Sequence, residues 1–356
     1  MSLLRINGMI DPHVHLRDLD WEHKGTFTSE TAAAIAGGYW AVLDMPNTMP
    51  STIDSSTLAM KKNTIRNKAL SDWGLYFGAA ASDNTEFYRS IWGSVCGIKI
   101  YNNATTGNLL IEEQALREKI YQAWHCKRPI AVHAEGETVA QILELVKKYR
   151  RFTHFTHIST AEEIHYLRQA KADGLPISIG VTPHHLYLTE DDIPSLGSLG
   201  LMKPELKTKH DQAALWQAIA EGLVDVIESD HAPHTLEEKM SDSPPYGVPG
   251  LETTLSLMLL AVREERLSLE QLIPMISENP RSIFGIKCPP DTYTLVDINI
   301  SHTIRNDELF TQCGWTPFNG MQVMGRVREV WIRGVQVFDG EQILVEAGFG
   351  QNIIAM

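Results

Sequence analysis

Two histidines near the start of the chain have the spacing of metal ligands. His13 and His15 lie two residues apart within residues 11–18, and alternation along a β-strand turns such residues to one face. Paired imidazoles at the carboxyl end of a strand suit a single metal ion. Arg17 follows on the same face, which indicates an anionic substrate beside the metal. The alternative is a pair of histidines on a solvated strand face.

Lys99 is a lysine inside an apolar strand. It lies between Ile98 and Ile100, where a buried ammonium costs several kcal/mol unless it is paired or neutralised. A side chain that extends to the strand end and reaches water is one solution. Carbamylation by carbon dioxide is another, because it creates a carboxylate-like group that can bridge two cations. Polar residues at other strand ends favour the second solution, namely His13, His15, His133, His157 and Asp230.

The elements that must position these residues alternate between short apolar runs and helical patterns, which is typical of a β/α series. After the strand of the first histidine pair, strands are expected near residues 39–45, 73–78, 95–101, 130–133, 152–157, 176–181 and 224–229. Helices are expected near residues 28–36, 55–70, 111–127, 137–149, 161–172, 212–221, 250–266 and 268–277. Eight strands in this arrangement predict an α/β fold, a (β/α)₈ TIM barrel with its active site at the carboxyl ends of the strands.

The pattern of polar and apolar residues changes after the predicted barrel. From about Tyr293 the residues alternate as in exposed β-strands, which predicts a small β appendage. We therefore expect a barrel over residues 8–288 and an appendage formed by residues 1–7 and 289–356.

Composition narrows the class of protein. The 356 residues carry a formal net charge of −13, and no basic run is visible, which argues against nucleic-acid partners. No apolar stretch reaches the roughly 18 residues of a membrane span, and no signal peptide precedes the first strand. Four scattered cysteines without a CxxC pair indicate reduced thiols. We expect a cytoplasmic enzyme without a membrane partner.

Several motifs carry a resemblance to a known family. They are residues 11–18, 45–48, 97–101, 132–135, 182–186, 229–239, 249–253 and 315–318. In these motifs, which occur in the family's order over nearly the whole chain, the sequence resembles dihydroorotases of the amidohydrolase superfamily. It is most similar to the dihydroorotase domain of the multifunctional animal pyrimidine-synthesis protein and its stand-alone relatives. The resemblance implies a barrel of the metal-dependent amidohydrolase type.

The resemblance also implies roles for individual residues. One zinc ion would bind His13, His15 and Asp230, a second would bind His133 and His157, and carboxylated Lys99 would bridge them. The substrate would contact Arg17, Asn47, Lys203, His234 and Gly247. The implied reaction is the reversible cyclisation of N-carbamoyl-L-aspartate to L-dihydroorotate in pyrimidine (UMP) biosynthesis. Asp230 would accept a proton and return it to the leaving nitrogen.

The sequence departs from the animal domains at several positions. Lys203 replaces an arginine at the substrate, and a lysine cannot reproduce a bidentate fork. Thr156 and Gly180 replace a cysteine and a glutamate that support an extra zinc ion, so we expect only two metals. Thr106, next to Thr105 in a loop that is mobile in the family, replaces a phenylalanine. Residues 18–20 depart from the usual Glu-Pro-Gly.

Two other functions stay open at this point. The chain could be another cyclic amidohydrolase of the hydantoinase or allantoinase kind, although Arg17 and Asn47 favour dihydroorotate. It could also be an inactive dihydroorotase-like scaffold for aspartate transcarbamoylase, although every proposed metal ligand is present. The sequence leaves a homodimer and an association with aspartate transcarbamoylase open.

Overall fold

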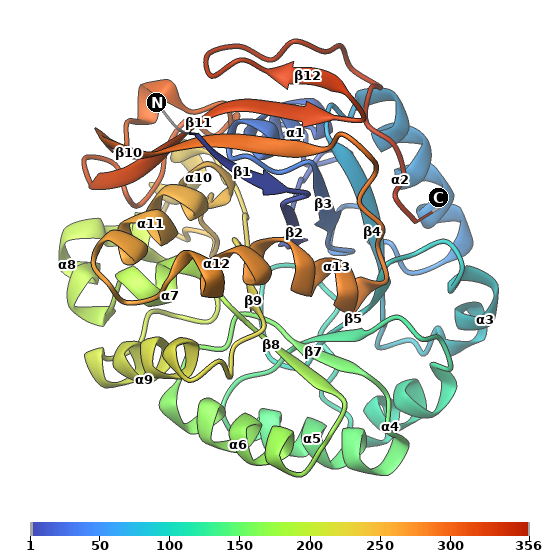
Figure 1. Ribbon diagram of the computed structural model, residues 1–356. Coiled ribbons are helices and arrows are strands. Elements are labelled where there is room, and N and C mark those ends of the chain that lie inside the picture. Colours follow the sequence, from blue (N-terminus) through green and yellow to red (C-terminus); the bar gives the residue numbers. More distant parts are fainter. Residues whose placement is uncertain (1–2, 355–356) are drawn as a thin grey trace.

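The computed structural model describes residues 3–354, and eight parallel strands form its centre (Figure 1). The strands follow one another around the sheet in sequence order. They are β2 (Ile10–Val14), β3 (Ala41–Asp44), β4 (Asp72–Gly78), β5 (Gly97–Tyr101), β6 (Ile130–His133), β7 (Thr153–Phe155), β8 (Ile177–Val181) and β9 (Val226–Ile227). The predicted (β/α)₈ barrel is therefore confirmed, with strands shorter than expected at several ends.

The barrel is closed between its first and last strands. Val14 forms a parallel bridge with His231, and the His15 amide donates to the His231 carbonyl oxygen at 2.7 Å. The last strand, β9, is only two residues long. Closure therefore depends on the segment after β9, which also carries Asp230.

Helices surround the barrel, and their side chains explain the alternation in the strands. The principal helices are α1 (Phe27–Ala36), α2 (Ser55–Lys68), α4 (Gln114–Ala123), α5 (Glu137–Tyr149), α6 (Ala161–Ala172), α9 (Lys209–Ala220), α11 (Leu251–Arg263), α12 (Leu269–Ile276) and α13 (Glu278–Phe284). Ile98 and Ile100 of β5 join the same apolar cluster as Ile142 of α5 and Leu167 of α6. Lys99, between the two isoleucines, is fully buried on the other side of the strand, inside the barrel.

Caps set where several helices begin. Thr208 caps α9, because its side chain accepts from the Asp211 amide while Asp211 accepts from the Thr208 amide. Such reciprocal caps satisfy amides that have no partner within the helix. The helix therefore begins at Lys209 rather than at the expected residue 212.

Several short elements were not predicted. They are α3 (Tyr88–Ile91), α7 (Pro183–Tyr187), α8 (Ile193–Leu196), α10 (Leu236–Lys239) and four short 3₁₀ segments over residues 85–87, 190–192, 197–200 and 306–308. The helix α13 was also missed. Pro280 is its third residue, in the first turn, where a proline removes no hydrogen bond of the helix. No helix among residues 3–354 is both long and apolar enough to cross a membrane.

A second, antiparallel sheet lies against one side of the barrel (Figure 1). It contains β1 (Leu4–Asn7), β10 (Tyr293–Thr303), β11 (Gln322–Ile332) and β12 (Val335–Phe338) in this order. The strand β1 pairs with β10, so the first strand of the chain belongs to the sheet of the last segment. We retain the division into residues 8–288, and 1–7 with 289–356, as a proposal.

Candidate metal centre and substrate pocket

Three proposed ligands come from the first strand of the barrel and from the segment after its last strand. The two histidines both lie close to one oxygen of the aspartate. His13 Nε2 lies 3.2 Å from Asp230 Oδ1, and His15 Nε2 lies 3.1 Å from the same oxygen. Within residues 3–354, these three residues are the one group of histidine, cysteine and acidic side chains close enough to hold a metal ion.

The other proposed ligands lie beside this group. His133 Nδ1 and His157 Nε2 are 3.1 Å apart, and the rings of His157 and His13 have centroids 5.1 Å apart. Lys99 Nζ donates to Thr156 Oγ1 at 3.0 Å, and that hydroxyl lies 3.1 Å from His157 Nε2. The lysine is thus one hydroxyl away from the second pair of histidines.

Hydrogen bonds orient two of the histidines. His15 Nδ1 donates to Asn47 Oδ1 at 2.7 Å, which leaves the Nε2 lone pair of a neutral ring facing Asp230. His133 Nε2 lies 3.0 Å from Glu135 Oε1, so its Nδ1 lone pair faces His157. A cation between these nitrogens would satisfy them, as partners on the far ring nitrogen commonly do for ligating histidines.

Burial sets the charge of the cluster. It lowers the pKa of His13, His15, His133 and His157, which keeps these imidazoles neutral and able to bind a cation. Burial also lowers the pKa of Lys99, which favours the neutral amine that reacts with carbon dioxide. It raises the pKa of Asp230. This set of imidazoles and a carboxylate fits zinc-like divalent cations.

The backbone near the cluster is held in sparsely populated conformations. Asp230 has a φ of 46° and His157 a φ of 38°, values that non-glycine residues rarely adopt.

A buried ion pair holds the segment that follows the first histidine pair. Lys61 Nζ lies 2.7 Å from Asp44 Oδ2. Asp44 in turn accepts from the Leu16 amide at 2.8 Å.

A pocket of about 290 Å³ opens beside the first histidine group. Its walls are His15, Arg17, Asn47, Thr105, Thr106, Lys203, Asp230, Ala232, Tyr246 and Gly247. Most of the predicted substrate residues therefore share one cavity with two proposed metal ligands. His234 is not among the walls, but its Nε2 lies 3.0 Å from an Arg17 amino group.

Arg17 and Lys203 bring positive charge to this pocket. The Arg17 guanidinium is fully buried, and its Nε donates to the Pro233 carbonyl oxygen at 3.0 Å. Burial lowers the pKa of Arg17 to about 10, so it stays charged near neutral pH. Lys203 Nζ lies 2.7 Å from Glu205 Oε1 and 4.7 Å from the centre of the Tyr246 ring.

Polar contacts connect residues 105–106 with the pocket walls. Asn47 Nδ2 donates to the Thr106 carbonyl oxygen at 2.9 Å, and Thr106 Oγ1 donates to the Tyr246 carbonyl oxygen at 3.1 Å. The hydroxyl of Thr106 therefore makes a polar contact where the animal domains carry a phenylalanine. Asn47 contacts both this loop and His15.

Sequence reasoning missed two acids near the cluster, the partly exposed Glu135 and the fully buried Glu228. Glu135 bonds His133, as described, and Glu228 Oε1 accepts from the His157 amide at 2.6 Å. A side chain at Gly180 would collide with Glu228, because its Cβ would lie 2.5 Å from Oε1. The carboxylate of Glu228 therefore occupies the space that the missing glutamate side chain at position 180 would have filled. The lack of a carboxylate there was one reason for expecting only two metals, and that reason no longer holds. That expectation itself stays a prediction.

His154 is a further buried histidine near the cluster. Simple alternation along the strand predicts a place in the core or against a helix, and its ring is fully buried and packs edge-on against Phe284 of α13, with ring centroids 5.7 Å apart. In the structure His154 Nε2 lies 3.0 Å from Glu228 Oε2 inside the barrel, because β7 ends at Phe155 and the backbone turns before His157. An acidic residue at the end of an apolar strand, as in residues 224–228, was the signal that could have identified Glu228.

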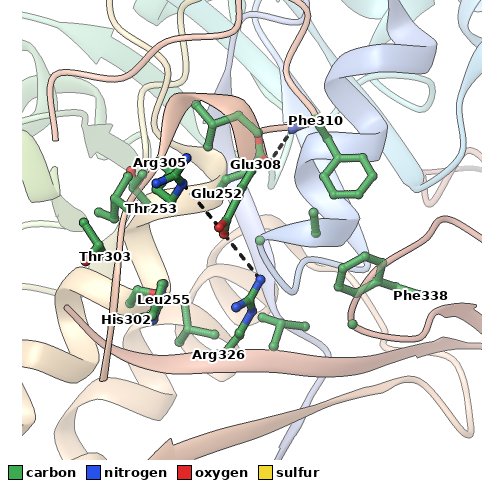
Figure 2. Close-up of a pocket in the computed structure, with 17 residues that line it drawn as sticks. Glu252, Thr253, Leu255, His302, Thr303, Arg305, Glu308, Phe310, Arg326 and Phe338 are labelled. Atoms are coloured by element: carbon green, nitrogen blue, oxygen red, sulfur yellow. Dashed lines mark hydrogen bonds and ion pairs between the residues drawn. The ribbon is translucent and has the colours of Figure 1, made fainter. Parts of the chain in front are cut away.

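A separate cavity of about 690 Å³ lies between α11 and the antiparallel sheet. Figure 2 shows Arg305 and Arg326 on either side of Glu308, and both arginines pair with it, at 3.6 and 3.4 Å. Glu252 accepts from the Phe310 amide at 2.8 Å in the same view. None of the predicted site residues lines this cavity.

Comparison with known proteins agrees with this geometry. Residues 6–288 match the amidohydrolase family. The chain is 42% identical over 355 residues to the multifunctional protein CAD of Squalus acanthias, covering 99% of the chain but only 16% of that protein. It is 36% identical over 349 residues to the dihydroorotase of Pyrococcus furiosus, covering 95% of the chain and 82% of the relative.

A solved structure gives the same fold. The L-hydantoinase from Arthrobacter aurescens superposes with a TM-score of 0.94 at 25% identity, covering 99% of this chain and 89% of that one. The chain therefore belongs to the amidohydrolase family, among its dihydroorotases.

Proposed function

We propose that this protein is a zinc-dependent dihydroorotase that interconverts N-carbamoyl-L-aspartate and L-dihydroorotate in pyrimidine (UMP) biosynthesis. One observation carries the proposal. The group formed by His13, His15 and Asp230 opens directly on a pocket lined by Arg17 and Lys203. A substrate with a carboxylate and a ring amide can meet the cations with one end and the metal group with the other.

The proposed centre holds two zinc ions. His13, His15 and Asp230 would hold one, and His133 and His157 the other. Carboxylated Lys99 would bridge them, since its amine is buried beside both groups. When bound, two such cations supply an activated water molecule near neutral pH and polarise the ring carbonyl.

Asp230 is the proposed proton carrier. It lines the pocket and also touches both histidines of the first group. In hydrolysis the attacking water gives its proton to the Asp230 carboxylate, and the carboxyl returns that proton to the ring nitrogen as the C–N bond breaks. In cyclisation the same transfers run in reverse, and water is released.

The remaining residues orient the substrate. Arg17 carries a permanent charge at the pocket and is held in plane by its bond to Pro233, which suits a charge-assisted contact with the substrate carboxylate. Lys203 adds a second cation as a point charge. Asn47 and Gly247 border the space for the ring. His234 supports Arg17 from behind.

The likeness to an L-hydantoinase makes another cyclic amidohydrolase the second candidate. Its substrate would lack a carboxylate in this position, so the buried charge of Arg17 argues for dihydroorotate. An inactive scaffold is the third candidate. The presence of every proposed ligand, three in one group and the others beside it, argues against it. The homodimer and the association with aspartate transcarbamoylase stay predictions.

The decisive experiment assays the purified chain for dihydroorotate hydrolysis, carbamoyl-aspartate cyclisation and hydantoin hydrolysis, with metal content measured on the same sample. We expect both dihydroorotate reactions, two zinc ions per chain and little hydantoin turnover. Faster hydantoin hydrolysis would favour the second candidate. A metal-loaded chain inactive on all three substrates would favour the scaffold.

A further inference from the structure

Glu228 is a buried carboxylate that reaches two of the proposed metal-holding residues. Its side chain has no exposed area. Oε1 accepts from the His157 amide at 2.6 Å and lies 3.6 Å from His13 Nδ1. Oε2 lies 3.0 Å from His154 Nε2. One carboxylate oxygen thus lies next to a residue proposed for each of the two metals.

Gly180 makes the room that this carboxylate occupies. A Cβ on Gly180 would lie 2.5 Å from Glu228 Oε1, 2.7 Å from Cδ and 3.0 Å from Oε2. Real Cβ atoms essentially never approach other atoms this closely, so a side chain at position 180 of β8 would force the Glu228 carboxylate out of its present position.

The contact with His13 has a specific consequence. His13 Nε2 faces Asp230 at 3.2 Å, so Nδ1 must carry the proton if Nε2 is to bind a cation. Nδ1 is buried and has no hydrogen-bond partner among residues 3–354. Glu228 Oε1 lies 3.6 Å away, which is an electrostatic contact rather than a hydrogen bond. A carboxylate beside the outer nitrogen of a ligating histidine favours the N–H at that nitrogen, helps to fix the ring and raises its basicity.

The contact with His157 acts on the backbone. With a φ of 38°, His157 is in a conformation that non-glycine residues rarely adopt and that persists only where neighbours enforce it. The hydrogen bond from its amide to Glu228 is such an enforcement. His154 anchors the other carboxylate oxygen and is itself held by Ser178 Oγ at 2.9 Å.

We infer that Glu228 is a positioning residue that holds one histidine of each metal in its binding geometry, and that the absence of a side chain at Gly180 leaves the space for it. The inference rests on the proposed metal centre. It assigns to Glu228 no contact with substrate or metal.

The first test compares Glu228→Gln with Glu252→Gln. Both replace a glutamate that accepts backbone amides, fully buried at Glu228 and partly buried at Glu252, but Glu252 touches no proposed ligand. We expect Glu228→Gln to weaken zinc binding about 10–100-fold, the usual effect of losing such a partner, in competition with a chelator. Glu252→Gln should leave zinc affinity unchanged. Equal zinc affinity in wild type and Glu228→Gln would overturn the inference.

The second test moves the carboxylate to the neighbouring strand. Aspartate oxygens lie two bonds from Cβ, which matches the 2.5 Å between the Gly180 Cβ position and Oε1. Glu228→Ala should lose zinc, and the double variant Gly180→Asp with Glu228→Ala should regain most of the affinity. Gly180→Asp alone should also bind zinc weakly, because two carboxylates then share one space. A folded double variant that binds zinc no better than Glu228→Ala would contradict the inference.

Metal counting separates the remaining outcomes. Three zinc ions on the wild-type chain, with one lost in Glu228→Gln, would make Glu228 a ligand and overturn the positioning role. A wild-type chain with neither zinc nor dihydroorotase activity would refute the proposed function itself. A zinc-loaded, active wild type beside an unaltered Glu228→Gln would refute only the role of Glu228.

Discussion

Replacing Lys203 by alanine should raise KM for dihydroorotate with little change in kcat. Lys203 lines the pocket, and its ammonium is held by Glu205 at 2.7 Å. Burial acts to lower the pKa of Lys203, but the hydrogen bond and charge of Glu205 raise it overall, so the lysine is charged at working pH. An incoming carboxylate must therefore compete with Glu205 for this ammonium.

The two interactions set the size of the effect. A hydrogen bond between charged groups contributes about 1.5–3 kcal/mol, while a partly exposed ion pair such as Lys203–Glu205 contributes about 0–1 kcal/mol. The difference, about 0.5–3 kcal/mol, corresponds to a KM about 2–150 times higher in Lys203→Ala. Because the contact is far from the reacting bond, ground state and transition state lose it equally and kcat is spared.

Glu205→Gln provides the matched control, because it frees the ammonium without removing it. We expect its KM to fall by up to about fivefold, the cost of loosening the ion pair. Lys203→Arg should also lower KM, since a guanidinium can bind the carboxylate with two hydrogen bonds. Steady-state hydrolysis of dihydroorotate, with zinc content checked for each variant, measures all three. An unchanged KM in Lys203→Ala, or a higher KM in Glu205→Gln, would show that Lys203 does not bind the substrate.

Three further outcomes are expected. Lys99→Ala should lose most zinc and activity, whereas the intact wild-type protein should show the added mass of one carbon dioxide; an unmodified lysine in an active, zinc-loaded sample would contradict the bridge. Asp230→Asn should keep metal and substrate but lower kcat by about 10²–10⁴, because an amide cannot carry the proton; unchanged turnover with intact zinc would reject the role. Burial raises the pKa of Glu252 to about 8 from its ordinary 4.5, so between these values the folded chain binds more protons there and stability falls as pH rises. Between these pH values Glu252→Gln should reduce the fall in the free energy of unfolding by up to about 1.4 kcal/mol per pH unit. The same dependence of melting temperature on pH in both proteins would refute this.

The barrel could be predicted from sequence because strand and helix periods alternate so regularly. The isoleucines on either side of Lys99 indicate a buried strand, and a lysine between them has to point into the barrel. Strand-end histidines could be grouped for the same reason, since the fold brings all strand ends to one face.

The supporting contacts could not be predicted, because they depend on distances between strands. Glu228 occupies the space opposite Gly180, and neither residue reveals this without the register of β8 and β9. Alternation could place His154 in the core but could not show that its ring bonds Glu228.

The seam of the barrel has a consequence for how the chain folds. Val14 and His231 join the first strand to the segment after the last, and the residues proposed for one zinc ion, His15 and Asp230, come from these same two segments, 215 positions apart. Closing such a long loop is slow, because the entropy of the chain is lost before the contacts between its ends stabilise the fold. A cation that binds only the closed form stabilises it in proportion to its concentration. Zinc would thus stabilise the closed barrel. Without zinc, the contact between the first strand and the segment after β9 should be the slowest part of the fold to form.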